Sequence, residues 1–133
     1  MKEFLVDLEG LKRLAQEVAR RLKGGEVIFL KGDLGAGKTT FTKFLVEALK
    51  PTEEVSVRSP TFAVMNVYPT EKGEVYHLDL YRVKNFDITD YLDSGILVVE
   101  WAEYLRDVEP DVVIEFETVD ENRRRVRIRG IDF

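Results

Sequence analysis

The sequence contains no cysteine among its 133 residues, so disulfide bridges, thiol catalysis and thiolate-bound metals are all excluded. A single histidine also excludes a metal site built from several imidazoles. No apolar run is long enough to span a bilayer, and the first residues lack the apolar core of a signal peptide. These absences lead us to expect a cytoplasmic protein that does not associate with membranes.

The overall composition is that of a folded domain. Charged residues make up 34% of the chain and hydrophobic residues 44%, which is enough for a substantial core. The length predicts a single domain over residues 1–133. A formal net charge of −5 argues against broad, non-specific binding to nucleic acid.

The strongest chemical signal is residues 32–39, Gly-Asp-Leu-Gly-Ala-Gly-Lys-Thr, which fit the phosphate-binding pattern G-x-x-x-x-G-K-[ST]. The continuous apolar run at residues 27–30 predicts a buried strand before the loop, and apolar residues at helical spacing predict a helix after it. A glycine-rich turn would explain the glycines but not the Lys-Thr pair at the required offset. The apolar helical positions are Phe41, Phe44, Leu45, Ala48 and Leu49.

Each residue type in this loop has a physical role in holding a triphosphate. The glycines let backbone N–H groups turn inward, and the helix that opens at Lys38 aims its positive dipole end at the phosphates. The Lys38 ammonium can reach the β and γ phosphates, and the Thr39 hydroxyl can ligate Mg²⁺. The expected nucleotide-binding residues are Gly32, Asp33, Gly35, Ala36, Gly37, Lys38, Thr39 and Thr40.

The remaining pattern predicts an α/β fold, with a central, partly parallel sheet flanked by helices in three layers. Alternating β-branched and aromatic residues predict a hairpin, and an apolar stripe predicts a helix before the P-loop. A second buried strand ends in a carboxylate, and two further strands follow it. The expected helices are residues 7–23 and, shorter, 86–93, with a loop or short helix at 101–107. The expected strands are residues 63–68, 74–80, 96–100, 112–119 and 123–128, with a turn at 69–73.

Two carboxylates and one hydroxyl are candidates for chemistry at the γ-phosphate. Glu100 ends an apolar strand downstream of the P-loop, which is the arrangement that places a carboxylate beside Mg²⁺; a surface glutamate at a strand end is the alternative. Asp79 shares a strand face with His77 and could hold a water of the metal or orient an attacking water; a solvent-facing carboxylate paired with Arg82 is the alternative. Thr61 follows a rigid proline and could sense the γ-phosphate, with an ordinary turn residue as the alternative.

Two features concern the base and the partner. Guanine-specific P-loop proteins usually carry an N-K-x-D motif, which this sequence lacks, so adenine is the expected base. Arg125, Arg127 and Arg129 alternate with apolar residues and predict one basic face on a half-buried strand. The simplest role of this face is a solvated edge that resists aggregation, and a docking face for RNA or an acidic partner is the alternative.

Four motifs together resemble the TsaE (YjeE) family, the small bacterial P-loop ATPases needed to make threonylcarbamoyladenosine in tRNA. They are residues 32–40, the Ser-Pro-Thr-Phe of 59–62, the His-Leu-Asp-Leu-Tyr-Arg of 77–82 and the Val-Val-Glu-Trp of 98–101. The motifs occur in family order with family-like spacing. Leu11 is a departure, because relatives often carry a threonine there, close to the adenine.

The resemblance implies roles for several residues. Thr39 and Glu100 would be Mg²⁺ ligands, and Asp79 an essential acid near the nucleotide. Residues 59–62 would be a switch loop that responds to the γ-phosphate, and Trp101 would lie close to the site. The activity implied is Mg²⁺-dependent hydrolysis of ATP to ADP, slow in the isolated chain, that resets a heterodimer of TsaB and TsaD. The chain would meet tRNA only indirectly. The candidate catalytic residues are therefore Lys38, Asp79, Glu100 and Thr61.

The residues also allow two functions from other classes. A small-molecule kinase would share the P-loop, but a chain of this length leaves little sequence for an acceptor pocket and a lid. A non-catalytic module would use nucleotide binding only as a structural switch. Hydrolysis with release of phosphate distinguishes an ATPase from both.

Overall fold

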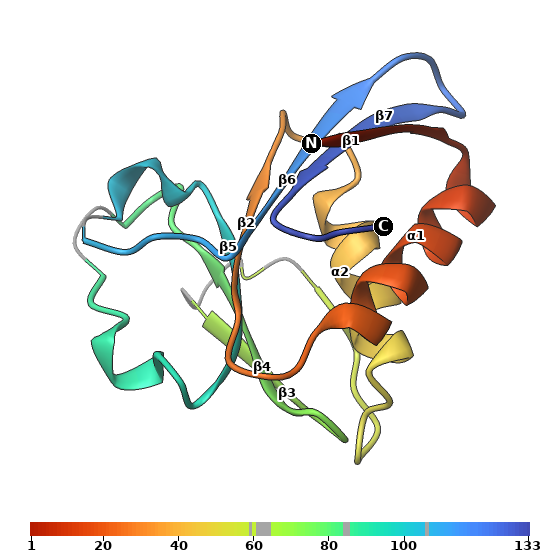
Figure 1. The fold of residues 1–133 in the computed structure, drawn as a ribbon. Coiled ribbons are helices and arrows are strands. Elements are labelled where there is room, and N and C mark those ends of the chain that lie inside the picture. Colours follow the sequence, from red (N-terminus) through yellow and green to blue (C-terminus); the bar gives the residue numbers. More distant parts are fainter. Residues whose placement is uncertain (59, 61–64, 84–85, 106) are drawn as a thin grey trace.

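The computed structural model describes residues 1–133 except 59, 61–64, 84–85 and 106. Its strands lie in one sheet with the order β1-β7-β6-β2-β5-β4-β3 (Figure 1). The elements are β1 (Lys2–Val6), α1 (Leu8–Arg21), β2 (Val27–Lys31), α2 (Lys38–Ala48), β3 (Met65–Thr70), β4 (Gly73–Asp79), β5 (Gly95–Glu100), β6 (Val112–Thr118) and β7 (Arg124–Arg129), with 3-10 turns η1 (Thr89–Tyr91) and η2 (Ala102–Tyr104).

The sheet is parallel in the centre and antiparallel at both margins. Strand β2 pairs in parallel with β5 and with β6, and β5 pairs in parallel with β4. The pairs β3–β4, β6–β7 and β1–β7 are antiparallel. The predicted α/β fold with a central, partly parallel sheet is therefore confirmed. Because β2, β5 and β4 run the same way, their carboxyl ends meet at one edge, which is where ligands bind in open α/β sheets.

Both α-helices cover the same face of the sheet (Figure 1). Helix α1 is capped by the preceding residue, Asp7, whose side chain accepts a hydrogen bond from the Gly10 amide at 2.8 Å. The apolar stripe of α1 packs with α2 and the facing strand residues into the larger core, which includes Leu14, Val18, Ile28, Phe41, Leu45, Val98 and Ile114. The helix predicted over residues 7–23 is confirmed as Leu8–Arg21.

The opposite face is covered over β2, β5 and β4 by loops and the turns η1 and η2, as the left side of Figure 1 shows. Their apolar side chains form a second core with Phe29, Leu78, Leu80, Val99 and Ala102. The short helix expected over residues 86–93 is a single 3-10 turn of three residues. Ring contacts from Tyr91 to Tyr76 and to Phe86 hold this turn against the sheet, so its position depends on packing between separate segments.

Two local predictions were incomplete or wrong. Strand β1 was not predicted, and it pairs along its whole length with β7 at the other end of the chain. The turn expected over residues 69–73 is shorter, because Pro69 and Thr70 belong to β3 and the Thr70 hydroxyl donates a 2.6 Å hydrogen bond to the Gly73 carbonyl. Neither helix in the described part of the chain has the length and apolar run that crossing a membrane would take.

Candidate nucleotide-binding site

The P-loop leaves the carboxyl end of β2 and enters α2 through glycines that no other residue could replace without strain. Gly37, the residue before α2, has φ 109° and ψ 8°, a left-handed conformation that favours glycine. At Gly32, with φ 150°, an added Cβ would lie 2.8 Å from the Phe116 carbonyl oxygen of β6. The loop therefore lies directly against β6, and the first N–H groups of α2 are left free for a ligand.

Lys38 is 5% exposed and connects three parts of the site. Its Nζ donates a 2.6 Å hydrogen bond to the Gly32 carbonyl and lies 3.8 Å from Glu100 Oε1. The same ammonium lies 4.5 Å from the centroid of the Trp101 ring, within the range of a cation–π contact. The ammonium group is thus held between the start of the loop and the end of β5, where an anion entering the cavity would meet it.

Glu100 is buried at the end of β5 and is held by the only histidine of the chain. The Nε2 of His77, on β4, lies 2.6 Å from Glu100 Oε2, and the His77 side chain is fully buried. An ionised carboxylate only accepts hydrogen bonds, so with Glu100 in that form Nε2 of His77 would be the donor. His77 Nδ1 is buried without a partner among the described residues. The hydrogen bond fixes one oxygen of Glu100 and leaves the other beside Lys38.

Asp79 and Trp101 complete this edge of the sheet. Asp79 ends β4 directly opposite Glu100 in the register, and its Oδ1 accepts a 3.0 Å hydrogen bond from the Tyr81 amide. Trp101 has φ 59° and ψ 46°, a left-handed conformation that is uncommon outside glycine, and its ring lies 4.9 Å from that of Tyr81. This turn of the backbone places the indole against the Lys38 ammonium.

One cavity of about 200 Å³ brings most of the predicted site residues together. Gly32, Asp33 and Ala36 lie instead along a groove on the other side of the loop, together with Glu115 and Arg127. Thr61 and most of the expected switch loop fall outside the described residues. The residues that line the smaller cavity are Leu34, Gly35, Gly37, Lys38, Thr39, Thr40, Asp79, Glu100, Trp101 and Arg124.

The residues at this cavity fit a magnesium ion that is bound mainly through a nucleotide. Within the described part of the chain, no cluster of three or more acidic or histidine side chains could hold a metal by itself. Thr39 and Glu100 nevertheless line the same cavity and offer one hydroxyl and one carboxylate. Mg²⁺ in phosphate-transfer sites takes one or two such protein ligands, with phosphate oxygens and waters as the rest.

A second and larger cavity of about 610 Å³ adjoins the first. It lies between the beginnings of α1 and α2 and the turn that joins β6 to β7. Gly37, Thr40 and Arg124 line both cavities. The smaller space matches a polyphosphate beside Lys38, and the larger one has room for a base and ribose. The larger cavity is lined by Asp7, Leu8, Glu9, Leu11, Gly37, Thr40, Glu121, Asn122 and Arg124.

Two residues of the site were missed or undervalued by sequence reasoning. His77 was given no role of its own, although its strand alternation placed it on the face of Asp79. Arg124 was not singled out among the arginines near the C-terminus, yet it lines both cavities. A signal for it existed, since Arg124 has the opposite parity to Arg125, Arg127 and Arg129 and must point to the opposite face of the strand.

Comparisons with known proteins agree on one family. The family model described as threonylcarbamoyl adenosine biosynthesis protein TsaE matches residues 5–127. The tRNA threonylcarbamoyladenosine biosynthesis protein TsaE of Aquifex aeolicus is 51% identical over 129 residues, which are 96% of each chain. The protein of the same name from Synechocystis is 40% identical over 116 residues, 79% of this chain and 72% of that one. The crystal structure of Bacillus subtilis YdiB superposes with a TM-score of 0.73 at 32% identity, covering 94% of this chain and 83% of YdiB.

Proposed function

The chain belongs to the TsaE family of threonylcarbamoyl adenosine biosynthesis proteins, and on this premise we propose that it binds ATP with Mg²⁺ and hydrolyses the ATP to ADP during tRNA modification. The observation that carries the proposal is the convergence of Lys38, Asp79 and Glu100 on one cavity at the beginning of α2. We further propose that residues 1–133 act as one P-loop ATPase domain.

Binding follows from the groups at the beginning of α2. The free N–H groups of the loop and of the first helical turn donate to phosphate oxygens, and the helix dipole favours the negative charge. Lys38 exchanges its hydrogen bond to the Gly32 carbonyl for one to the β and γ phosphates. Thr39 and Glu100 would hold Mg²⁺, which supplies neutralisation of the charge on the β and γ oxygens when bound.

The two carboxylates are suited to different tasks. Glu100 has one oxygen tied to His77 and the other beside Lys38, so it is a fixed, buried ligand. Asp79 is less buried, lines the same cavity and has one oxygen held by the Tyr81 amide. We therefore assign the orientation of the attacking water to Asp79 and the metal contact to Glu100. Thr61 stays a prediction for sensing the γ-phosphate.

The proposed partners are TsaB and TsaD. Hydrolysis of ATP by this chain would reset the complex of these two proteins, and the chain would contact tRNA only indirectly. The relatives are named for the tRNA modification, which supports this placement in the pathway. The charges of the arginine face argue against direct docking of RNA, because Arg125 and Arg127 are paired with Glu3 and Glu117. Family membership leaves the kinase alternative without support.

The test uses Trp101, the only tryptophan, as a probe beside Lys38. Titration with ATP, ADP or GTP in the presence of Mg²⁺ should give a saturable change in emission, with the adenine nucleotides preferred. Release of phosphate from bound ATP in a single turnover should be slow and should accelerate when TsaB and TsaD are added. Absence of nucleotide binding would contradict the proposed site, and rapid hydrolysis that ignores both proteins would contradict the reset role.

A further inference from the structure

The arginine cluster near the C-terminus is divided between the two faces of the sheet. Arg125, Arg127 and Arg129 point to the face without helices and pair with carboxylates of β1 and β6. Arg123, in the turn, donates to Asp120, and this hydrogen bond lowers the pKa of the Asp120 carboxyl. Arg124 points to the helix side, and among the described residues it alone in this cluster has no carboxylate partner.

Some N–H donors of the Arg124 guanidinium have no hydrogen-bond partner among the described residues. One terminal nitrogen donates to the Asp120 and Arg123 carbonyls at 2.9 and 3.0 Å, which occupies both of its N–H groups. The other terminal nitrogen makes a single, long contact of 3.4 Å with the Gly35 carbonyl of the P-loop. The Nε atom is buried and has no partner in the described part of the chain. Of the five donors of an arginine, two are therefore unused and one is used poorly.

The position of Arg124 indicates which ligand would take these donors. The side chain lies where the two cavities meet, beside Gly37 and Thr40 of the α2 beginning. Carboxylates of Asp7, Glu9 and Glu121 line the larger cavity, which suits an uncharged base and ribose better than phosphate. A nucleotide with its β and γ phosphates at Lys38 and its base in the larger cavity would have its α-phosphate at this junction.

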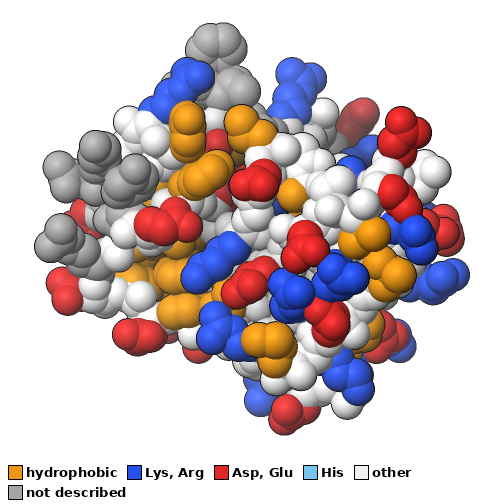
Figure 2. Space-filling model, turned by 90° about the horizontal axis from the view of Figure 1, so that it is seen from above, with side chains coloured by type: hydrophobic (Ala, Val, Ile, Leu, Met, Phe, Trp, Pro, Cys, Tyr) orange, Lys and Arg blue, Asp and Glu red, His pale blue; other side chains and the backbone are white. Residues whose placement is uncertain are grey.

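We propose that Arg124 binds the α-phosphate of the nucleotide, exchanging its long contact with the Gly35 carbonyl for a charge-assisted hydrogen bond. The proposal rests on the proposed function of the P-loop but concerns a residue outside the four motifs shared with the family. It assigns the arginine cluster two separate tasks. Arg124 binds the ligand, while the other arginines pair with carboxylates. Because acidic side chains lie beside these arginines, the surface is less basic than their number suggests (Figure 2).

The test compares Arg124→Gln with Arg123→Gln, its neighbour in sequence. Hydrogen bonds to charged groups predict that Arg124→Gln weakens the binding of ADP and ATP about 10- to 100-fold. Arg124→Lys should fall between the wild type and Arg124→Gln, because lysine keeps the charge but not the planar fork. Arg123→Gln should bind as the wild type does, since Arg123 lines neither cavity. Calorimetry with Mg²⁺ measures the affinities, and circular dichroism verifies that each variant is folded.

Pyrophosphate, used as a competitor of ADP, distinguishes the α-phosphate position from the β and γ positions. It should compete equally well in the wild type and in Arg124→Gln, because its two phosphates can occupy the β and γ positions at Lys38 and leave the α position empty. Equal losses for ADP and pyrophosphate would overturn the assignment to the α-phosphate. Unchanged ADP binding by folded Arg124→Gln would overturn any contact with the nucleotide. Failure of the wild type to bind ADP would instead overturn the proposed function.

Discussion

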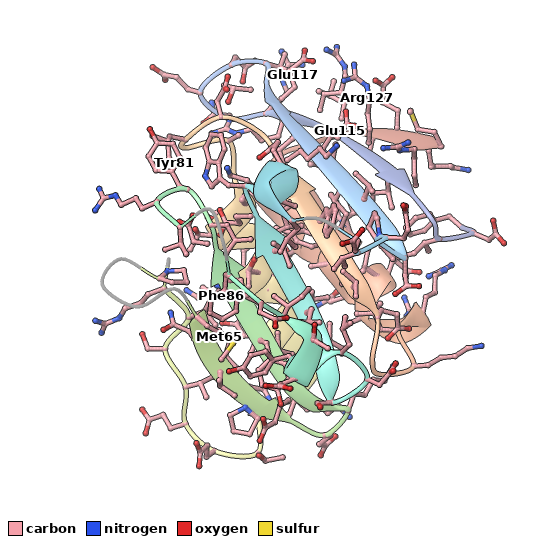
Figure 3. All side chains as sticks on the ribbon, turned by 90° about the vertical axis from the view of Figure 1, so that its left-hand side faces the viewer. Met65, Tyr81, Phe86, Glu115, Glu117 and Arg127 are labelled. Atoms are coloured by element: carbon pink, nitrogen blue, oxygen red, sulfur yellow. The ribbon has the colours of Figure 1, made fainter. Side chains whose placement is uncertain are left out.

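The two halves of the sheet hold their charges in opposite ways. In the antiparallel half, formed by β1, β7 and β6, charged side chains are exposed on the face without helices and pair across strands. Figure 3 shows Arg127 near Glu115 and Glu117 on this face, and Arg127 also donates to Glu3 at 2.9 Å. At the carboxyl ends of the parallel strands, Lys38, His77 and Glu100 are buried, and Glu100 contacts both of the others.

This difference shows that burial of charge, rather than its amount, indicates the site. Exposed ion pairs are screened by solvent, and each contributes little to stability. Buried charges are costly to desolvate. Removing one partner of a buried pair lowers stability strongly, because the other charge is left buried and uncompensated. The lysine, histidine and glutamate that are buried together at the cavity are therefore the groups on which the proposed site rests. Variants in each half can test this contrast.

The largest effect is expected for Lys38→Ala. Removing the ammonium takes away the contact with the β and γ phosphates and leaves Glu100 without its neighbouring cation. We expect a loss of ATP affinity on the order of 100-fold and no measurable hydrolysis. Calorimetry measures the affinity, with Lys43→Ala, an exposed lysine of α2, as the matched control. ATP binding by Lys38→Ala at wild-type strength would remove the basis for the site.

A smaller and more selective effect is expected for Glu100→Gln. The amide keeps the shape of the side chain but loses the charge that a metal requires. The concentration of Mg²⁺ that half-saturates ATP binding should rise on the order of 10- to 100-fold, while binding without Mg²⁺ should not weaken. Trp101 emission during a Mg²⁺ titration measures this. Glu103→Gln, at an exposed glutamate of η2, should behave as the wild type, and equal Mg²⁺ dependence in both variants would refute the ligand role.

Much of the fold could be predicted because its signals are local. The P-loop, the strand before it and the strand ending at Glu100 follow from residue spacing within a few positions. Strand β1 was missed because its partner β7 lies at the far end of the chain, and a five-residue edge strand has little pattern of its own. A helix was expected where the structure has a 3-10 turn, because ring contacts of Tyr91 with Phe86 and with Tyr76 of β4 define this segment.

The position of a site residue could be predicted where one helix or strand places it. It could not be predicted where it depends on how two strands pair. Thr39, Asp79 and Glu100 stand at the ends of predicted elements, so their convergence followed from a parallel sheet. The His77–Glu100 hydrogen bond joins residues 23 positions apart through the pairing of β4 with β5, which no local pattern specifies. Arg124 reaches the cavities only because β7 lies beside β6 and β1. The role of Thr61 stays a prediction.

The buried His77–Glu100 pair predicts a moderate effect on stability. His77→Phe should lower the free energy of unfolding by about 1–3 kcal/mol, because the Glu100 carboxylate loses its donor in the interior. Urea unfolding followed by Trp101 emission measures the change. The loss should be smaller in a Glu100→Gln background, because the partner charge is already gone. Equal losses in both backgrounds would mean that His77 acts through packing alone.

The smallest effect is expected for Arg127→Gln in the antiparallel half. The guanidinium donates to Glu3, which raises the pKa of Arg127, yet the pair is exposed and solvent takes over its hydrogen bonds when it is broken. The urea midpoint and the affinity for ATP should therefore match those of the wild type.

Binding of tRNA is the more informative measurement, because it tests the docking alternative for the arginine face. The charge-reversing pair Arg125→Glu and Arg127→Glu should leave any association with tRNA unchanged. If tRNA association were lost while ATP binding stayed intact, the exposed half of the sheet would also carry a function. The two halves would then differ in which ligand each binds, and no longer in whether they bind one.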